Sequence, residues 1–322
     1  MTSTLPSEVQ EVFDRFITTE YVTVDGRRQP IAWPVTPYYH QGESTIDVTT
    51  GVGYPKKALD AARNPRVGLL FSDPSGSGIE SGIKVLVQGS AEVDDRDLRA
   101  NRERYKRESL EKLPATKEML PPKVIEGMFG WYFERLYVKV RPERIFVWAD
   151  GDLSAPPQIH DSRLEEVRSG HVEEPPEPHP GAAGGAVAWD GRIEELGRRH
   201  RTAALAWCGP DGFPLAVRVP VEPDPAAGKV RIGAEPDGLP LLAGPACLTA
   251  HAHAPDFSWQ ENFQVRGDLV RDGDGWALVP HKLIGGFELP DESEFARYRR
   301  NLKKSIRFYR TRRPFLANRE RH

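Results

Sequence analysis

The chain has 322 residues, of which 39% are hydrophobic and 28% are charged. These values are ordinary for a globular protein, and the length predicts two domains. The formal net charge of −3 argues against nucleic acid as a general partner. No apolar run approaches the ~18 residues of a membrane span, and no secretion signal is recognisable at the start, so we expect a cytoplasmic protein with no membrane partner.

The first half predicts one helix followed mainly by strands. Apolar spacing over residues 7–16 predicts a helix capped by Ser7. Alternating apolar stretches predict strands at 18–24, 31–39, 45–50, 67–71, 84–93, 137–140 and 144–148. Two further helices are expected at 95–113 and 123–136, because prolines separate them.

Residues 49–71 are the most informative segment for function. Thr49 and Thr50 end a predicted strand, a Gly-rich turn follows, and Lys56 and Lys57 open a short predicted helix. Hydroxyls, ammonium groups and the N–H groups of a helix start are the donors that a phosphate prefers. A lysine pair in a turn is also commonly plain solvated charge, and the spacing alone leaves both interpretations open.

A stretch rich in proline and glycine divides the chain. Residues 152–186 cannot bury enough apolar surface to offset their chain entropy, so we interpret them as a linker. The predicted domains are therefore residues 1–151 and 187–322.

The second half repeats the first in looser form. It predicts a helix at 189–200 and strands at 203–208, 215–221, 229–233, after Pro245 and around 263–267. Pro245 follows Pro65 by 180 residues and Gly267 follows Gly89 by 178, which indicates a duplication.

Aligning the two prolines predicts only one phosphate site. Pro236 and Asp237 fall at the positions of Lys56 and Lys57. A carboxylate repels a phosphate and proline lacks an N–H group, so the second domain is expected to be degenerate and to bind none.

Residues 297–322 carry eleven lysines or arginines against Glu320 alone. Apolar side chains recur there at three- and four-residue spacing, which predicts a basic C-terminal helix docked on an acidic body. Binding of nucleic acid or an anionic membrane by this tail is the alternative.

His251 and His253 form a His-x-His pair, whose side chains point the same way on a strand. Such a pair can hold a metal or haem iron. No third ligand with suitable spacing is visible, so we predict no metal site and interpret both as pocket or interface histidines. Cys208 and Cys247 fit no metal spacing and are interpreted as small buried side chains.

Residues 5–150 resemble the flavin-binding split-barrel superfamily, which includes pyridoxamine 5′-phosphate oxidase and flavin- or deazaflavin-dependent reductases. The second half resembles it more faintly. The resemblance rests on the order and spacing of Trp33-Pro34-Val35, Thr49-Thr50, Lys56-Lys57, Asn64-Pro65-Arg66-Val67, Gln88-Gly89-Ser90-Ala91-Glu92 and Arg141-Pro142-Glu143-Arg144. It implies a mainly β fold with helices (α+β), built as two tandem antiparallel split β-barrels, with FMN bound where two barrels face each other.

The resemblance also implies roles for single residues. Lys56 and Lys57 match the pair that grips the FMN phosphate, and Thr49 and Thr50 lie beside it. The other matched cofactor positions are Trp33, Pro34 and Val35 along the flavin ring edge and Lys84 near the flavin. The oxidase has an arginine where Trp33 stands, and its C-terminal arginine and histidine have no counterpart here, so we do not expect the vitamin-B6 oxidase itself.

The expected function is therefore two-electron or hydride transfer through FMN to an unidentified small molecule, because the cofactor carries such chemistry. An F420-dependent reductase and a non-enzymatic flavin or haem carrier are the alternatives. No catalytic residue is assigned. The sequence leaves open whether the two barrels of one chain pair with each other or the chain forms a homodimer.

Overall fold

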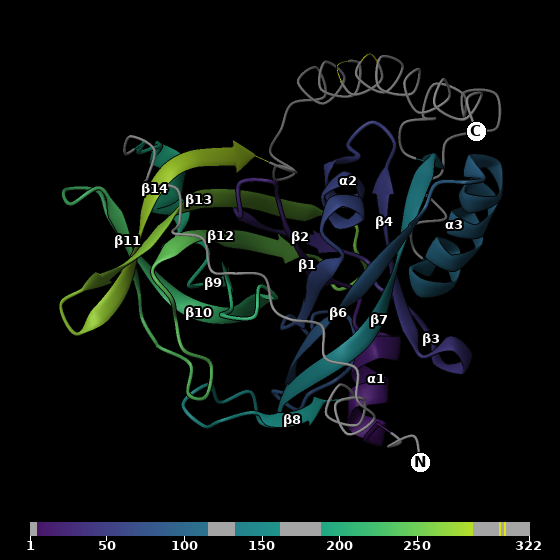
Figure 1. Ribbon diagram of the computed structural model, residues 1–322, viewed down its shortest axis with the longest axis horizontal. Coiled ribbons are helices and arrows are strands. Elements are labelled where there is room, and N and C mark those ends of the chain that lie inside the picture. Colours follow the sequence, from purple (N-terminus) through teal and green to yellow (C-terminus); the bar gives the residue numbers. More distant parts are fainter. Residues whose placement is uncertain (1–4, 115–132, 162–187, 286–302, 304–305, 307–322) are drawn as a thin grey trace.

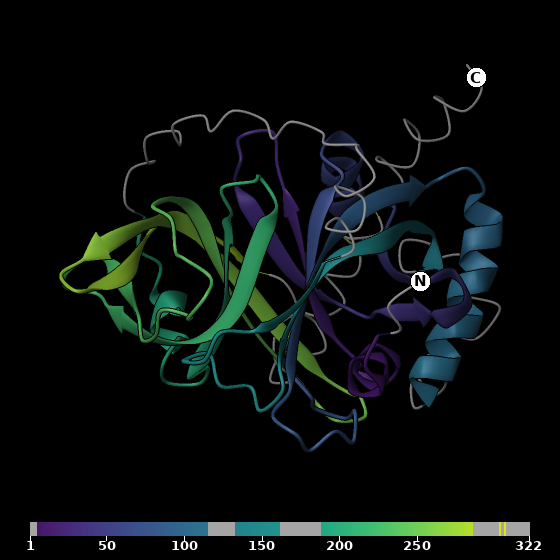
Figure 2. The ribbon, with the colours of Figure 1, turned by 60° about the horizontal axis from the view of Figure 1, so that its bottom comes forward.

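The structure is a computed structural model that describes residues 5–114, 133–161, 188–285, 303 and 306. Two antiparallel β units lie side by side, with α1, α2 and α3 all on the first (Figures 1 and 2). We call residues 5–161 the front barrel and residues 188–285 the back barrel. The mainly β, tandem-barrel fold that the sequence predicted is thus confirmed.

The front barrel is one sheet in the order β2-β1-β5-β6-β7-β4-β3, with β8 added on β7. Its strands are β1 (Thr19–Val24), β2 (Pro30–Val35), β3 (Tyr38–His40), β4 (Thr45–Gly51), β5 (Arg66–Phe71), β6 (Lys84–Asp94), β7 (Arg135–Trp148) and β8 (Gln158–Asp161). Its helices are α1 (Ser7–Arg15), α2 (Lys56–Arg63) and α3 (Leu98–Lys112). β8 falls within the stretch predicted as linker.

The back barrel is closed, in the order β10-β11-β14-β13-β12-β9. Its strands are β9 (Thr202–Cys208), β10 (Pro214–Asp224), β11 (Lys229–Ile232), β12 (Gly244–His253), β13 (Gln260–Asp272) and β14 (Gly275–Gly285). A single 3-10 turn, η4 (Gly191–Glu195), precedes them where the sequence predicted a helix over 189–200. Gly197, with φ of 77°, is among the residues that interrupt it.

The two barrels of the chain pack against each other. All six residues of β1 are buried, because one face of the strand lines the front core and the other meets the back barrel. Tyr21 belongs to the front core, which α1 and α2 complete, whereas its neighbour Val22 packs in one cluster with Trp207 and Val217 of the back barrel. This contact joins β1, β2 and β5 to β9, β10 and β12.

The strand pairing shows the duplication directly. Reading β10 as the counterpart of β2 plus β3, the two barrels have the same strand order. Each has a register shift at a glycine, Gly89 in β6 and Gly267 in β13. Because Val67 pairs with Gly89 and Ala246 with Gly267, the offset along β5 and β12 is 179, so aligning Pro65 with Pro245 was wrong by one residue.

Several sequence predictions need correction. Pro6 precedes α1 and no side chain caps it, so Ser7 is the first helical residue. The strand predicted over 31–39 is two strands, because Pro37 between β2 and β3 has no N–H to donate. Arg135 and Leu136 begin β7, which runs unbroken through the two strands predicted there. Residues 123–132 of the helix predicted over 123–136, most of the linker and nearly all of the C-terminal tail lie outside the described residues.

Candidate functional site

The segment after β4 forms a tight turn and then α2. Thr50, next to the last residue of β4, donates its hydroxyl to the carbonyl of Tyr54 at 2.9 Å, while the Tyr54 N–H bonds to the Gly51 carbonyl at 2.8 Å. Pro55 precedes α2, and no side chain caps the first turn of the helix. The N–H groups at this helix start are therefore without a side-chain acceptor, as an anion-binding turn requires.

Lys56 and Lys57, the two predicted phosphate ligands, have different surroundings. The Lys56 ammonium lies 2.8 Å from a carboxylate oxygen of Asp60 and 3.6 Å from one of Asp25. Two carboxylates thus already compensate its charge. Lys57 instead lies within the electrostatic range of Arg135 at the start of β7, and no acceptor for its ammonium is found in the described part of the chain.

The electrostatics single out Lys57. Burial, and then the positive charge of Arg135, lower the pKa of the Lys57 ammonium from 10.5 to about 8. The Arg135 guanidinium stacks on the ring of Tyr105 with 4.3 Å between charge and ring centre, and donates to its hydroxyl. The Lys57 ammonium and the Arg135 guanidinium repel each other, and an anion bound close to both would offset this repulsion. We call Lys57, Arg135 and the start of α2 the anion seat.

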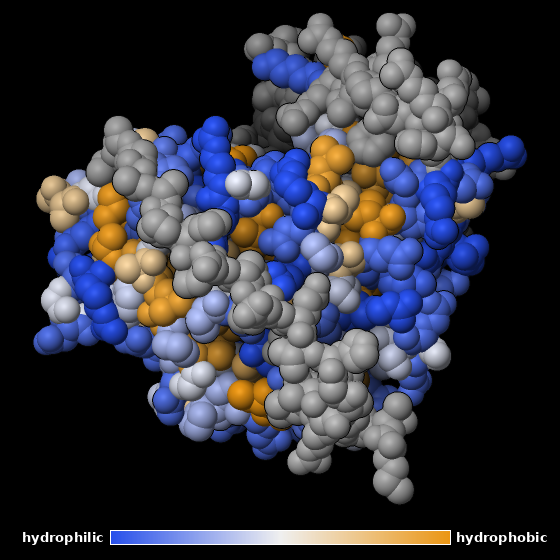
Figure 3. Space-filling model, in the orientation of Figure 1, coloured by the Kyte–Doolittle hydropathy of each residue, from blue (hydrophilic) through white to orange (hydrophobic). Residues whose placement is uncertain are grey.

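Apolar surface borders the anion seat. Tyr54 and Leu59 are 37% and 45% exposed, unusually high for large hydrophobic residues of this chain. Figure 3 shows apolar side chains gathered over α2 and the adjoining part of the front barrel. A ligand with a phosphate and a flat apolar ring would find both kinds of surface here.

The predicted ring-edge strand is less accessible than the sequence suggested. The Ala32 carbonyl accepts hydrogen bonds from Thr249 and Gln264, so the back barrel covers the outer edge of β2 there. The backbone N–H and C=O groups of successive residues point to opposite edges of a strand. Since those of Ala32 face the back barrel, those of Trp33 and Val35 face β1, with which both residues pair. Pro34 has no N–H to offer.

Lys84 lies at the opposite end of β6 from the anion seat. It opens β6, whereas Thr49 and Thr50 lie across β7 from the last residues of that strand, with about 30 Å of strand between. The Lys84 ammonium donates to the Gly151 carbonyl. Burial and the nearby Arg218 lower its pKa. The structure thus groups Lys84 with residues of the barrel contact.

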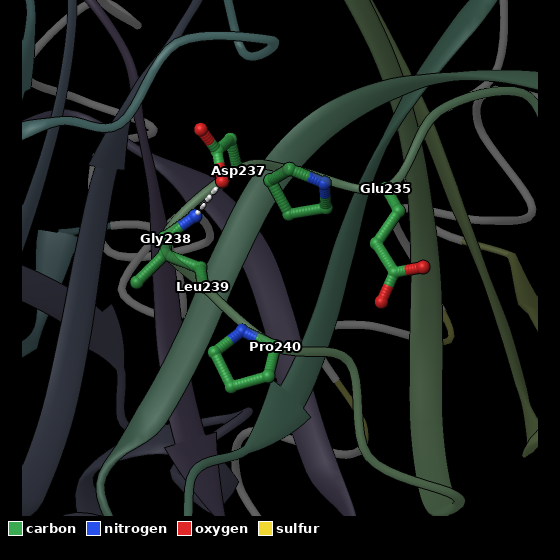
Figure 4. A pocket seen from close by; sticks show the side chains of 6 residues that line it. Glu235, Asp237, Gly238, Leu239 and Pro240 are labelled. Carbon is green, nitrogen blue, oxygen red and sulfur yellow. Dashed lines mark hydrogen bonds between the residues drawn. The ribbon is translucent and has the colours of Figure 1, made fainter.

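The back barrel has a loop where the front barrel has the lysine turn and α2. Residues 235–240, between β11 and β12, surround a hollow of about 410 Å³ (Figure 4). Its charged lining groups are the carboxylates of Glu235 and Asp237, and Asp237 accepts from the Gly238 N–H at 2.9 Å. This loop has neither the helix start nor the cations of the anion seat.

A buried polar group joins the barrels beside Lys84. The Glu20 carboxylate receives Arg218 at 2.5 Å, Ser72 at 2.6 Å and His251 at 2.8 Å. Burial alone would raise the pKa of Glu20, but Arg218 and His251 lower it to about 2. Asp73 and His253 adjoin this group. We call Glu20, Ser72, Asp73, Arg218, His251 and His253 the contact cluster.

Sequence reasoning missed most of the contact cluster. A charged residue inside the apolar run of β1 was the available signal for Glu20, because buried carboxylates need partners. It also missed a cleft of about 350 Å³ between α1, β3 and α3. There Arg104 donates to Asp47 at 2.6 Å and to Glu108 at 2.7 Å, and its guanidinium lies over the ring of Tyr137. These contacts satisfy a buried ion pair that fixes α3 to the sheet.

An eight-stranded antiparallel sheet and a closed six-stranded antiparallel barrel, which has a loop in place of α2, define the fold class of this chain. Similar solved structures include a protein of Listeria innocua described as a candidate pyridoxamine 5′-phosphate oxidase, 18% identical over 44% of this chain and 97% of that one, with a TM-score of 0.32. An F420 reductase is 15% identical over 42% of this chain and 94% of that one, at 0.31. The haem storage protein HutZ of Vibrio cholerae is 15% identical over 46% and 95%, at 0.32.

The matched structures include the pyridoxamine 5′-phosphate oxidase-like group that the sequence resembles. Each covers about half of this chain, and likeness at this level says nothing of ligand or reaction. No protein-family model and no curated protein matches the chain. Among the described residues, no helix has the length and apolarity of a membrane span.

Proposed function

We propose that the chain binds FMN, with the phosphate in the anion seat, and acts as a flavin-dependent oxidoreductase on a small molecule. The observation that carries this proposal is Lys57, a half-buried ammonium next to Arg135 with no acceptor in the described residues. Desolvating a cation without a partner is costly, and a dianionic phosphate removes that cost. Two-electron chemistry would be supplied by the flavin.

The residues present fit such a cofactor in part. Lys57 and the uncapped start of α2 would hold the phosphate, and the exposed Tyr54 and Leu59 offer apolar surface for a ring. Lys56 contributes less than the sequence suggested, because Asp60 and Asp25 already pair with it.

Titration with two flavins tests the seat. We expect the chain to bind FMN well above riboflavin, since riboflavin lacks the phosphate. Lys57→Ala should lower FMN affinity by about 10- to 100-fold, the value of one charge-assisted contact, and leave riboflavin binding unchanged. Lys56→Ala is the matched control and should change FMN affinity by less than about threefold.

The same titration separates the alternatives. Equal affinity for FMN and riboflavin, or full FMN affinity in Lys57→Ala, contradicts the proposed seat. Binding of F420 in preference to FMN makes the chain a deazaflavin protein. Haem would need a ligand other than His251 and His253, because both are buried and hydrogen-bonded.

A further inference from the structure

Helix α3 is a part of the front barrel that the barrel fold itself does not require. In the front barrel, residues 95–134 lie between β6 and β7, and α3 is the described helix of that segment. In the back barrel, Gly273 and Asp274 alone join the corresponding strands β13 and β14, and the barrel closes. Helix α3 therefore occurs, like α2, only in the half of the chain that contains the anion seat.

Helix α3 buries few of its side chains. Its buried residues are Leu98, Asn101 and Tyr105, which their three- and four-residue spacing places on one face. Leu98 belongs to the core of the front barrel, and the Asn101 side chain donates to the carbonyl of the last residue of β6 at 3.0 Å. Tyr105 belongs instead to a separate buried cluster with Tyr38, Phe133 and Tyr137. Tyr105 thus anchors α3 over β7, outside the main core.

Tyr105 meets Arg135 where β7 begins, beside the turn that leads into α2. Gly51 pairs with Arg135 between β4 and β7, and the Val52 N–H donates to the Glu134 carbonyl at 3.0 Å, so the backbone fixes the start of β7 next to this turn. The Arg135 guanidinium lies over the Tyr105 ring, 4.3 Å from the ring centre, and its Nη2 donates to the hydroxyl at 3.0 Å. Tyr105 therefore holds the Arg135 side chain at two points.

We propose that Tyr105 is a positioning residue of the anion seat, which holds the Arg135 guanidinium near Lys57 so that both cations are in place before a phosphate binds. An unrestrained arginine side chain loses rotamer freedom when it pairs with a ligand. A guanidinium already held by a ring face and a hydroxyl loses less of it, and the affinity for the anion is higher by that difference. The inference rests on the proposed function, which places the FMN phosphate in this seat.

The position of Arg135 also has an electrostatic consequence for Lys57. After burial, the positive charge of Arg135 is the second cause that lowers the pKa of the Lys57 ammonium from 10.5 to about 8. When the Tyr105 ring is removed, the guanidinium is free to move away, and the pKa of Lys57 should rise. This change needs no ligand, so the role of Tyr105 can be measured in the free protein.

A double-mutant cycle on FMN affinity tests the proposal in the full-length protein. Arg135→Leu should lower the affinity by about 10- to 100-fold and Tyr105→Leu by about 3- to 10-fold, while riboflavin affinity stays unchanged. In the Arg135→Leu background, Tyr105→Leu should have no further effect, because Tyr105 acts through Arg135. Tyr137→Phe is the matched control, since it removes the 2.7 Å hydrogen bond from β7 to Glu108 of α3 and leaves the bond between Arg135 and Tyr105.

The pKa of Lys57 is a second readout, which a purely structural role of Tyr105 would not move. It is measured without ligand by NMR of the methylated lysines, with the Lys57 signal assigned through Lys57→Arg. We expect the pKa of Lys57 to be higher in Tyr105→Leu than in the wild type and unchanged in Tyr137→Phe.

Two results would overturn the role of Tyr105: an equal loss of FMN affinity from Tyr105→Leu with and without Arg135, or a wild-type Lys57 pKa in Tyr105→Leu. Equal affinity of the wild-type chain for FMN and riboflavin contradicts the proposed function instead, and the lysine titration then still decides whether Tyr105 positions Arg135. Circular dichroism establishes that each variant is folded. Should Tyr105→Leu unfold, Tyr105→Met takes its place, because its longer side chain fills more of the space of the ring.

Discussion

The front and back barrels have one strand order but differ at several places. The back barrel closes through the continuous strand β10, whose first part pairs with β9 and whose last part pairs with β11. In the front barrel, Pro37 interrupts the corresponding path, so β2 pairs with β1 and β3 with β4 as separate strands. Between β4 and β5 the front barrel has α2, whereas the back barrel has the loop 233–243.

The comparison separates the features that maintain the barrel fold from those that could form a binding site. The bulge glycines Gly89 and Gly267 are present in both halves, and a Cβ on either would collide with a backbone carbonyl, of Arg141 or Val279 respectively. Helix α2 and Lys57 occur in one half only. The shared features maintain the barrel, and the features of the front half alone are the ones to test for binding.

The largest expected effect concerns the contact between the barrels. Arg218→Leu removes the guanidinium that compensates Glu20, and the Glu20 side chain is only 1% exposed. A buried charge left without its partner typically costs about 3–5 kcal/mol of unfolding free energy. Urea unfolding measures this loss, and we expect separate transitions of the two barrels if the contact is what couples them.

An exposed ion pair provides the control for Arg218. Arg15 and Glu11 pair at 2.5 Å with side chains 46% and 51% exposed, so Arg15→Ala should cost no more than about 0.5 kcal/mol. A loss below about 1 kcal/mol in Arg218→Leu would show that Glu20 is solvated or protonated, and would remove the cluster as the link between the halves.

The next largest loss of unfolding free energy is expected for alanine substitutions at the two bulge glycines, which test whether the bulges are equivalent. Gly89→Ala and Gly267→Ala should each cost about 3 kcal/mol, because the new methyl meets a backbone oxygen that cannot turn away. Gly42→Ala, where a Cβ meets nothing within 4 Å, is the control and should be nearly neutral. A large loss of unfolding free energy in one barrel and none in the other would show that the two halves are not structurally equivalent.

The sequence predicted strands better than the features that depend on distant residues. Alternation located most strands of both barrels, since each has one face in a core. It failed at 189–200, where apolar spacing suggested a helix but Gly191 and Gly197 stand within the segment. The sequence also contained no sign of the surroundings of Lys56, because the Asp25 carboxylate that shares Lys56 with Asp60 comes from another turn. Tertiary partners of this kind leave no local pattern.

A pH series sharpens the assignment of the anion seat to the front barrel. The pKa of Lys57 in the free protein is lowered to about 8, so the charged form is lost as pH rises through that value. FMN affinity should therefore fall above pH 8 by up to about tenfold per unit. Riboflavin affinity should stay level across the same range, and Lys57→Ala should abolish the dependence. An equal pH dependence for both flavins would place the titrating group at the ring.

The last prediction concerns a substitution in the back barrel, which we expect to leave the number of FMN molecules bound per chain unchanged. Asp237→Lys adds a cation to the loop that replaces α2, at the residue that the alignment of Pro65 with Pro245 matched to Lys57, yet we expect FMN to remain at one molecule per chain in an absorbance titration. The loop still lacks a helix start, Pro236 still lacks an N–H, and Glu235 still places a carboxylate in the same hollow. Asp237→Asn, which removes the charge without adding one, is the matched control. A second FMN in Asp237→Lys alone would mean that charge, rather than α2, distinguishes the two halves.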